Sequence, residues 1–362
     1  MRGVQCHRAS RAGSSHHARQ GPGSTGRGFV VNRFALARPA SFEAAQAALN
    51  DDRFTLPILK AGGIDLLDHL KEGLVEPDAL IDIKRLGRAA GRSPISRQGD
   101  RIRVEATTTL AEIASSTVLR QSAPALAQAI EDAASPQVRS VATAAGNLLQ
   151  RPRCWYYRNS KFFCNKKGGG TCFAMEGENR YHAIFHTGPC VIVHPSNLAP
   201  ALHVLDGTVH VMGGRRKQIP IAELFHMPAE GIFSEHNLEK GELITHITLK
   251  PVEFCGFYAI KEKTSFDWPL AMAAAALELD GQTIRSARIC AGAVAPIPWH
   301  LPEVEKALVG VGLDDDSALR AACERSVERA EPLEHNGYKT KLLPVAVRRA
   351  VLRAAGRGEN KQ

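Results

Sequence analysis

Four of the eight cysteines in this 362-residue chain lie between Arg151 and Cys190, in a stretch rich in basic, glycine and aromatic residues. Four neighbouring thiols can form disulfides, bind zinc or hold an iron–sulfur cluster, and each choice imposes a different local fold. The first residues lack the apolar segment of a secretory signal, so we expect a reducing compartment and no structural disulfides. The candidate metal ligands are Cys154, Cys164, Cys172 and Cys190.

The spacing of these cysteines only partly decides between a zinc site and an iron–sulfur cluster. Nine, seven and seventeen residues separate successive cysteines, whereas structural zinc sites usually pair ligands two to four residues apart. A mixed zinc site stays open because three histidines lie nearby: His182, His186 and His194. The wide spacing favours four thiolates on an iron–sulfur cluster, and unligated thiols are the third interpretation. Six basic residues would offset the negative charge of such a cluster: Arg151, Arg153, Arg158, Lys161, Lys166 and Lys167.

The formal net charge of +9 is concentrated at the two ends of the chain. Residues 1–28 carry five Arg and no acidic residue, with few apolar side chains, so we expect a disordered basic tail. The near-neutral body argues against a nucleic-acid surface. The longest apolar run, Trp268–Leu279, is too short to span a bilayer. We therefore expect a soluble cytoplasmic protein, with export to the periplasm alongside a signal-bearing partner as the alternative.

Strand and helix patterns alternate over residues 29–150, which predicts an α/β fold for the first half. We expect strands at 29–36, 54–60, 78–83 and 101–105, and helices at 41–49, 66–74, from Thr109 onward and at 124–133. Further strands are expected at 209–212, 218–221 and 242–249. Pro251 marks a domain border, and residues 251–355 are expected to form a small α+β domain. That domain would contain a long Ala-rich helix, Pro269–Leu279.

Two short segments could bind phosphate. The first runs from a predicted strand through paired glycines into a helix, where backbone N–H groups and the helix N-terminus can hold a phosphate. An ordinary turn is the alternative. Its residues are Lys60, Ala61, Gly62, Gly63, Ile64, Asp65 and Leu66.

The second segment is Thr143–Asn147, a run of small residues with one hydroxyl and one amide. It too could cradle a diphosphate with backbone donors. Two such segments about 80 residues apart suggest a dinucleotide held between two subdomains. The candidate binding residues here are Thr143, Gly146 and Asn147.

With these segments in this order, the chain resembles the FAD-binding medium subunit of the xanthine dehydrogenase and carbon monoxide dehydrogenase group of molybdenum hydroxylases. The resemblance spans about residues 34–352. Both phosphate segments are similar to the family's flavin diphosphate motifs, and four further segments resemble family motifs: His194–Leu198, Gly241–Thr245, Ser265–Leu270 and Gly292–Pro296. It implies FAD as cofactor, with Ser196, Asn197 and Leu243 near the flavin and Lys261, or Lys263, approaching its ring.

The resemblance also implies a domain plan. Residues 29–250 would form a two-subdomain FAD-binding domain of the PCMH type, and residues 251–355 a small domain like the CO dehydrogenase flavoprotein C-terminal domain. Residues 151–190 resemble an insert found in a branch with aldehyde oxidoreductases and 4-hydroxybenzoyl-CoA reductase, where four cysteines hold a 4Fe–4S cluster. Three residues depart from the motifs, and one of them is Asn197, which stands where Asp is common. Ile64 replaces a small polar residue, and Ala145 replaces a glycine, which requires a negative φ there.

The function implied by the resemblance is electron transfer. A large molybdopterin-binding subunit would turn over the substrate, and a small subunit would carry 2Fe–2S clusters. This chain would pass electrons through FAD to an external acceptor. Two alternatives stay open on the sequence: a flavin oxidoreductase of related fold acting alone, and a zinc-stabilised interaction protein.

Overall fold

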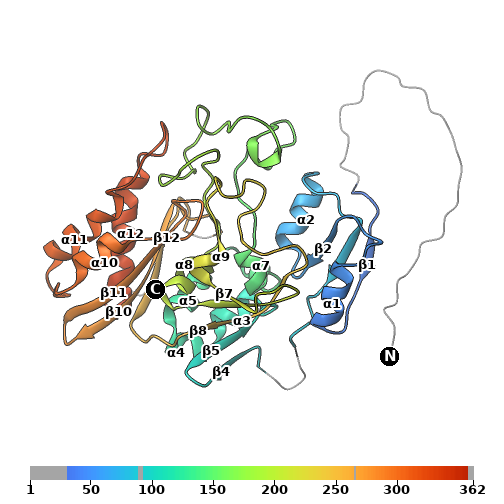
Figure 1. Ribbon diagram of the computed structural model, residues 1–362. Coiled ribbons are helices and arrows are strands. Elements are labelled where there is room, and N and C mark those ends of the chain that lie inside the picture. The colour runs from blue at the N-terminus through green and yellow to red at the C-terminus, as the bar shows by residue number, and fades with distance from the viewer. Residues whose placement is uncertain (1–30, 89–92, 265, 358–362) are drawn as a thin grey trace, which may run out of the picture.

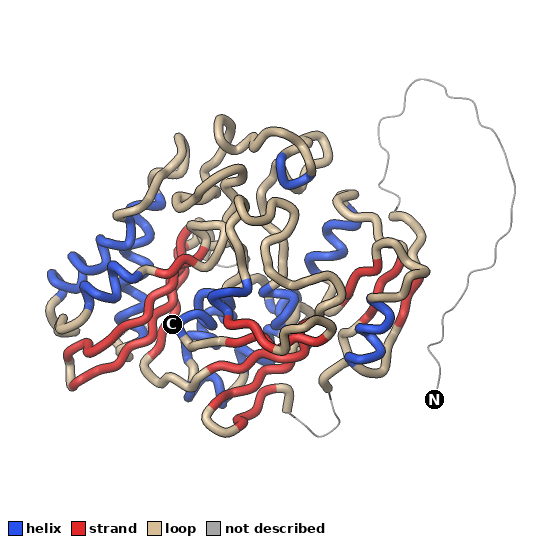
Figure 2. The backbone as a smooth tube through the Cα atoms, viewed as in Figure 1, coloured by secondary structure: helices blue, strands red, loops and turns tan. Residues whose placement is uncertain are grey.

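The computed structural model describes residues 31–88, 93–264 and 266–357, so the predicted basic tail lies outside the described residues. The described chain forms three sheets that follow one another along the sequence, with helices packed on them (Figures 1 and 2). No helix among these residues is long and apolar enough to cross a membrane.

The first sheet is small and parallel. Its strands are β1 (Ala35–Ala37), β2 (Pro57–Lys60) and β3 (Ala79–Asp82), in the order β1-β3-β2. Helix α1 (Phe42–Leu49) begins at Ser41, whose hydroxyl accepts a hydrogen bond from the N–H of Ala44, as its sequence predicts. Helix α2 (Ile64–Lys71) connects β2 to β3. The predicted α/β pattern holds in this subdomain.

The second sheet is antiparallel instead, with five strands in the order β4-β5-β8-β6-β7. These strands are β4 (Ile95–Gln98), β5 (Arg101–Glu105), β6 (Thr208–Met212), β7 (Gln218–Pro220) and β8 (Leu243–Leu249). Its helices are α3 (Leu110–Ser115), α4 (Thr117–Ser122), α5 (Pro124–Glu131), α6 (Pro136–Arg139), α7 (Ala144–Leu148), α8 (Leu198–Val204) and α9 (Ile221–Leu224). Helix α3 begins after Thr109, as predicted, and Thr109 and Glu112 form a capping box there. Strand β4 was not predicted.

The third sheet has the order β12-β11-β10-β9: β9 (Cys255–Ile260), β10 (Ala271–Asp280), β11 (Thr283–Gly292) and β12 (Trp299–His300). Helices α10 (Pro302–Leu308), α11 (Asp316–Glu324) and α12 (Lys339–Ala354) complete the α+β domain, with a short 3-10 turn, Arg325–Val327. The predicted helix at Pro269–Leu279 is wrong, because that segment is strand β10. It pairs with β9 on one side and β11 on the other, and Ala271–Leu277 are buried. Small side chains leave room for helix α12 to pack closely on this sheet.

The cysteine segment, residues 151–197, crosses the top of Figure 1 as loops, and its one regular element is a 3-10 turn at Asn165–Lys167. Its last part is pinned to the C-terminal domain. The N–H of Ile184 donates to the carbonyl of Val294, and the Asn336 side-chain amide donates to the carbonyls of His182 and Ala183. Because the segment has little regular structure, such bonds are what fix its shape.

Candidate functional site

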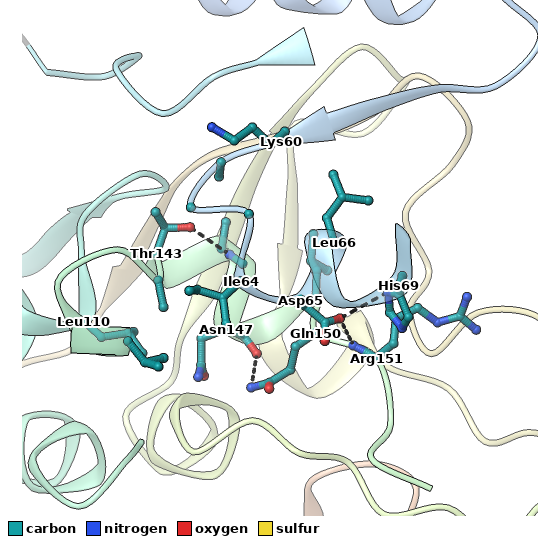
Figure 3. Close-up of a pocket in the computed structure, with 18 of the residues that line it drawn as sticks. Lys60, Ile64, Asp65, Leu66, His69, Leu110, Thr143, Asn147, Gln150 and Arg151 are labelled. Atoms are coloured by element: carbon teal, nitrogen blue, oxygen red, sulfur yellow. Dashed lines mark hydrogen bonds and ion pairs between the residues drawn. The ribbon is translucent and has the colours of Figure 1, made fainter. Parts of the chain in front are cut away.

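A cavity of about 690 Å³ lies where the two N-terminal subdomains meet the start of the cysteine segment (Figure 3). The structure brings both predicted phosphate segments into its wall, although they are far apart in the sequence. Twelve of the fourteen predicted cofactor residues line it: Lys60, Ala61, Gly62, Gly63, Ile64, Asp65, Leu66, Thr143, Gly146, Asn147, Asn197 and Leu243. Ser196 and Lys261 are not among the lining residues.

Two glycines let the first segment pack against the second subdomain. A Cβ on Gly62 would lie 2.2 Å from the carbonyl oxygen of Val141, so only glycine allows this approach. Gly63 has φ +82°, a left-handed conformation that starts helix α2 immediately afterwards. The glycine pair thus determines how closely residues 60–66 approach residues 141–147.

The free hydrogen-bond donors of the cavity lie in the first segment. Among the described residues, no acceptor pairs with the backbone N–H groups of residues 62–66, which include the first turn of α2. These N–H groups and the positive end of the helix dipole form a site suited to a phosphate group.

The second segment does not offer the backbone donors that its sequence suggested. The N–H of Ala144 donates to the carbonyl of Thr108, and that of Ala145 to the carbonyl of Ala106. The N–H of Gly146 donates to the Thr143 hydroxyl, which caps helix α7. Ala145 has negative φ, as its place in the motif requires. This segment therefore contributes side chains and shape to the cavity.

Asn147 is the polar side chain that the second segment presents. Its Oδ1 accepts hydrogen bonds from the Ser196 hydroxyl at 2.7 Å and from the N–H of Leu198 at 3.3 Å. Because a backbone N–H can only donate, Oδ1 is the acceptor and Nδ2 remains as a donor at the cavity wall. Ser196, itself fully buried, positions Asn147 from outside the cavity.

Asp65 binds the cysteine segment. Its carboxylate accepts from the N–H of Arg151 at 2.8 Å and forms ion pairs of 2.8 Å with both Arg153 and Arg158. Burial alone would raise the pKa of the Asp65 carboxyl, but these arginines and the Arg151 N–H hold that pKa below its ordinary value. Figure 3 shows Asp65 directed toward Arg151 and His69.

Of the three lysines proposed from the sequence, Lys60 and Lys261 are paired. Lys60 forms a 3.1 Å ion pair with Asp82, across strands β2 and β3. Lys261 donates to the backbone carbonyl of Asp132 at 2.9 Å, and Ala133, next in the chain, lines the cavity. Lys263 is exposed.

Sequence reasoning missed the aromatic side chains at the cavity. Phe266 and Trp268 line it, and Phe266 is 66% exposed with φ +58°. The guanidinium of Arg153 lies 4.6 Å from the centre of the Trp268 ring. Both residues belong to Ser265–Leu270, which resembles a family segment, but the sequence alone did not assign their rings to the cavity wall.

The four predicted metal ligands line a second, small pocket: Cys154, Cys164, Cys172 and Cys190. The seven described cysteines are free thiols. His182 Nε2 lies 3.3 Å from the Cys154 sulfur, while His186 and His194 do not line the pocket. Over the described residues, no group of three or more His, Cys, Asp or Glu side chains is placed to hold a metal ion.

The basic residues of the segment do not simply surround the thiols. Arg153 and Arg158 pair with Asp65 and with Asp68. Lys167 donates to the carbonyls of Tyr156 and Asn159. Carboxylates therefore partly neutralise Arg153 and Arg158, whereas Lys167 keeps its full charge because carbonyls are neutral. Lys166 does line the cysteine pocket.

One residue, Tyr157, lines both the large cavity and the cysteine pocket. It is buried, and the Arg151 guanidinium lies 5.0 Å from the centre of its ring. The two pockets are thus separated at this point by the thickness of one side chain.

The large cavity fits a dinucleotide cofactor. Its volume lies within the range of about 300–1,000 Å³ that is usual for ligand pockets. It combines free backbone donors at one helix N-terminus with apolar walls formed by residues such as Leu149, Leu243 and Ile244.

Comparison with known proteins agrees with this arrangement. Residues 32–251 match the family described as the FAD binding domain in molybdopterin dehydrogenase, and residues 257–354 match the CO dehydrogenase flavoprotein C-terminal domain. The chain is 32% identical over 302 residues to the aldehyde oxidoreductase FAD-binding subunit PaoB of Escherichia coli, covering 82% of this chain and 90% of that one. It is 27% identical to the carbon monoxide dehydrogenase medium chain of Afipia carboxidovorans, covering 91% and 100%.

Solved structures share the fold. A carbon monoxide dehydrogenase chain from Hydrogenophaga pseudoflava superposes with a TM-score of 0.68 at 24% identity, covering 91% of this chain and 99% of that one. A chain of quinoline 2-oxidoreductase from Pseudomonas putida superposes with a TM-score of 0.69 at 20% identity, covering 91% and 99%. The predicted fold class, a FAD-binding domain followed by a flavoprotein C-terminal domain, is confirmed.

Proposed function

This chain belongs to the medium, FAD-binding subunits of the molybdenum hydroxylase family, and we propose that it is the flavin electron-transfer subunit of such a hydroxylase. The observation that supports this most is the large cavity, where the free N–H groups of residues 62–66 face the wall formed by Thr143 and Asn147. When bound, FAD would supply the redox chemistry, because it exchanges electrons singly or in pairs.

The residues of the chain would bind and orient this cofactor. The N–H groups of residues 62–66 would hold the diphosphate, and Asn147 Nδ2 would donate a further hydrogen bond from the opposite wall. Leu243 and its apolar neighbours would exclude water from the cavity. No side chain of this site is assigned a proton transfer on substrate.

We also propose the assembly. The relatives are named as FAD-binding subunits or medium chains, which supports a large molybdopterin-binding partner and a small 2Fe–2S partner for this chain. The identity with an aldehyde oxidoreductase subunit supports an aldehyde substrate for the assembled enzyme. The domain border at about residue 250, and a cytoplasmic location, are parts of the same proposal.

A further part of the proposal is a 4Fe–4S cluster on the four thiols of the cysteine pocket. The support is that Cys154, Cys164, Cys172 and Cys190 line one pocket, with Lys166 beside them. In a cluster each iron takes its own thiolate, so the thiols need not converge on one ion as they must for zinc. Anaerobic purification with iron, zinc and sulfide analysis tests it. About four irons per chain are expected, and one zinc without iron refutes the cluster.

The flavin assignment has its own test. Titration of flavin-free protein with FAD, followed by quenching of flavin fluorescence, is expected to give one site per chain. A folded chain that binds no FAD, alone or with its partner subunits, would refute the proposed function. Lys261→Ala and Lys263→Ala would show which lysine influences the ring, by a shift of the flavin reduction potential. Unchanged potentials in both variants would exclude that role.

A further inference from the structure

The cysteine pocket depends on contacts from outside its own segment. Residues 151–197 contain one short 3-10 turn and no strand among the described residues, so few backbone ladders stabilise them. Segments of this kind open locally at low free energy unless side-chain contacts fasten them. The contacts that fasten residues 151–167 therefore determine how often the thiols become accessible.

The first of these contacts begins at the FAD cavity. Asp65 lies in the first turn of α2, within the stretch whose N–H groups are free for a phosphate. Its Oδ2 accepts from the N–H of Arg151 at 2.8 Å, at the start of the cysteine segment. A ligand that orders residues 62–66 would also order this hydrogen bond.

The second contact carries the connection to the thiols. Arg151 Nε lies 2.9 Å from Glu235 Oε2, and Lys166 Nζ lies 2.6 Å from Glu235 Oε1. Lys166 lines the cysteine pocket, and Arg151 lines the large cavity. Glu235 lines neither, so it joins a cation of one pocket to a cation of the other.

Burial makes this connection strong. The Glu235 side chain is 5% exposed and that of Lys166 is 1% exposed. Burial by itself would raise the pKa of Glu235, but Arg151 and Lys166 hold that pKa below its ordinary value, so the carboxylate is charged at neutral pH. Removing one member leaves a buried charge without its partner, which is strongly unfavourable.

We propose that Glu235 is a positioning residue through which dinucleotide binding in the large cavity stabilises the cysteine pocket. The connection runs from the α2 N-terminus through Asp65 and Arg151 to Glu235, and from there to Lys166. The inference rests on the proposed function, because FAD is the ligand. Linkage makes the effect reciprocal: whatever stabilises the cysteine pocket tightens FAD binding by the same factor.

Thiol labelling tests this coupling. Full-length protein, with and without saturating FAD, is treated with N-ethylmaleimide, and modification of each pocket cysteine is followed by peptide mass spectrometry. Labelling of the two buried thiols, Cys164 and Cys190, requires the pocket to open whether the thiols are free or hold iron, so their labelling rate is the readout. In the unaltered protein FAD is expected to slow labelling by about fivefold or more, the usual size of a coupling between sites. In Glu235→Gln, FAD is expected to bind and to change the labelling rate less than about twofold.

Two further variants complete the design. The double variant Glu235→Gln with Lys166→Met removes the buried ammonium together with its counter-ion, so it replaces the single variant if Glu235→Gln does not fold. In the double variant, too, FAD is expected to have no effect on the labelling rate. Glu239→Gln changes an exposed carboxylate nearby and is expected to keep the effect. FAD-independent labelling in the unaltered protein, or full protection in the Glu235 variants, overturns the coupling. A protein that binds no FAD overturns the proposed function instead.

Discussion

The substitution Gly62→Ala tests the geometry of the FAD cavity most directly. An alanine Cβ at this position would lie 2.2 Å from the Val141 carbonyl oxygen and 2.9 Å from its carbon. Both are backbone atoms, so neither can turn away as a flexible side chain would. To accept the methyl group, residues 61–64 must move away from residues 141–142, and that contact is what brings the two wall segments together.

The magnitude follows from the cost of overpacking. Inserting a methyl group into a well-packed contact costs about 1–3 kcal/mol. If the movement is tolerated in the free protein and reversed on binding, this cost appears in the affinity. Since about 1.4 kcal/mol corresponds to a tenfold change, the Kd for FAD should rise by roughly 5- to 150-fold. The free energy of unfolding should fall by at most about 3 kcal/mol.

The assay is a fluorescence titration of flavin-free protein with FAD, with thermal unfolding measured in parallel. Gly312→Ala is the matched control, because no atom lies within 4 Å of the added Cβ and its φ is not left-handed. It should leave the Kd unchanged. A folded Gly62→Ala protein that binds FAD within about twofold of the parent would refute the reasoning that this contact shapes the cavity.

Three further predictions follow from individual contacts. Ser196→Ala removes a donor to Asn147 Oδ1, so FAD binding should weaken by about 0.5–1.5 kcal/mol in the same titration, while an unchanged Kd would show that Asn147 needs no such support. Thr109→Ala removes the cap of α3 and should lower stability to urea by about 1 kcal/mol without altering FAD affinity; a loss of affinity would contradict a purely structural cap. Burial lowers the pKa of His203 to about 4 and that of His246 to about 3. Below pH 6.5 the unfolded chain therefore binds more protons than the folded chain. The free energy of unfolding should fall between pH 6.5 and pH 4, by at most about 1.4 kcal/mol per pH unit for each histidine. A free energy of unfolding that stays constant over this range would refute the prediction.

Local signals in the sequence predicted local structure well. Ser41 and Thr109 cap the helices that their positions indicated, and Gly62 with Gly63 marked the turn that enters the cavity. These features depend on a few adjacent residues, so a sequence reveals them. The patterns of the two phosphate segments suggested that they hold one dinucleotide, and the resemblance to family motifs supported that pairing.

In strand β10, tertiary packing outweighs the helix propensity of the sequence. The alanines of β10 have high helix propensity, yet they form a central strand because it is paired on both edges and buried. Gly256 on the neighbouring strand shows the same constraint, since a Cβ there would lie 2.5 Å from the backbone N of Ala354 in α12. The close contact between helix α12 and the sheet requires small residues, and helix propensity, which describes single residues, does not reveal this requirement.

Ion pairs between residues far apart in the sequence could not be predicted either. Glu235 lies in a stretch without any recognisable motif, and its partners Arg151 and Lys166 are 84 and 69 residues away. The Arg and Lys residues of the cysteine segment looked like a single charged group in the sequence. In the structure Arg151 and Lys166 share Glu235, and Arg153 and Arg158 share Asp65, because buried charges need partners of opposite charge.

The cysteine segment leaves the fold and returns to it at neighbouring points. The Gln150 side chain donates to the carbonyl of Pro195 at 3.4 Å, so the two ends of the segment are bridged by one side chain. Residues 151–197 contribute no strand to the three sheets, so the order of the strands in each sheet does not depend on this segment. In evolution, such a segment can be gained or lost in one event if a short closure joins its ends and other side chains replace Ile184 and Phe185 in the core of the C-terminal domain. The unit that such an event transfers carries all four thiols, while Asp65 and Glu235 must already be in place on the host fold to receive it.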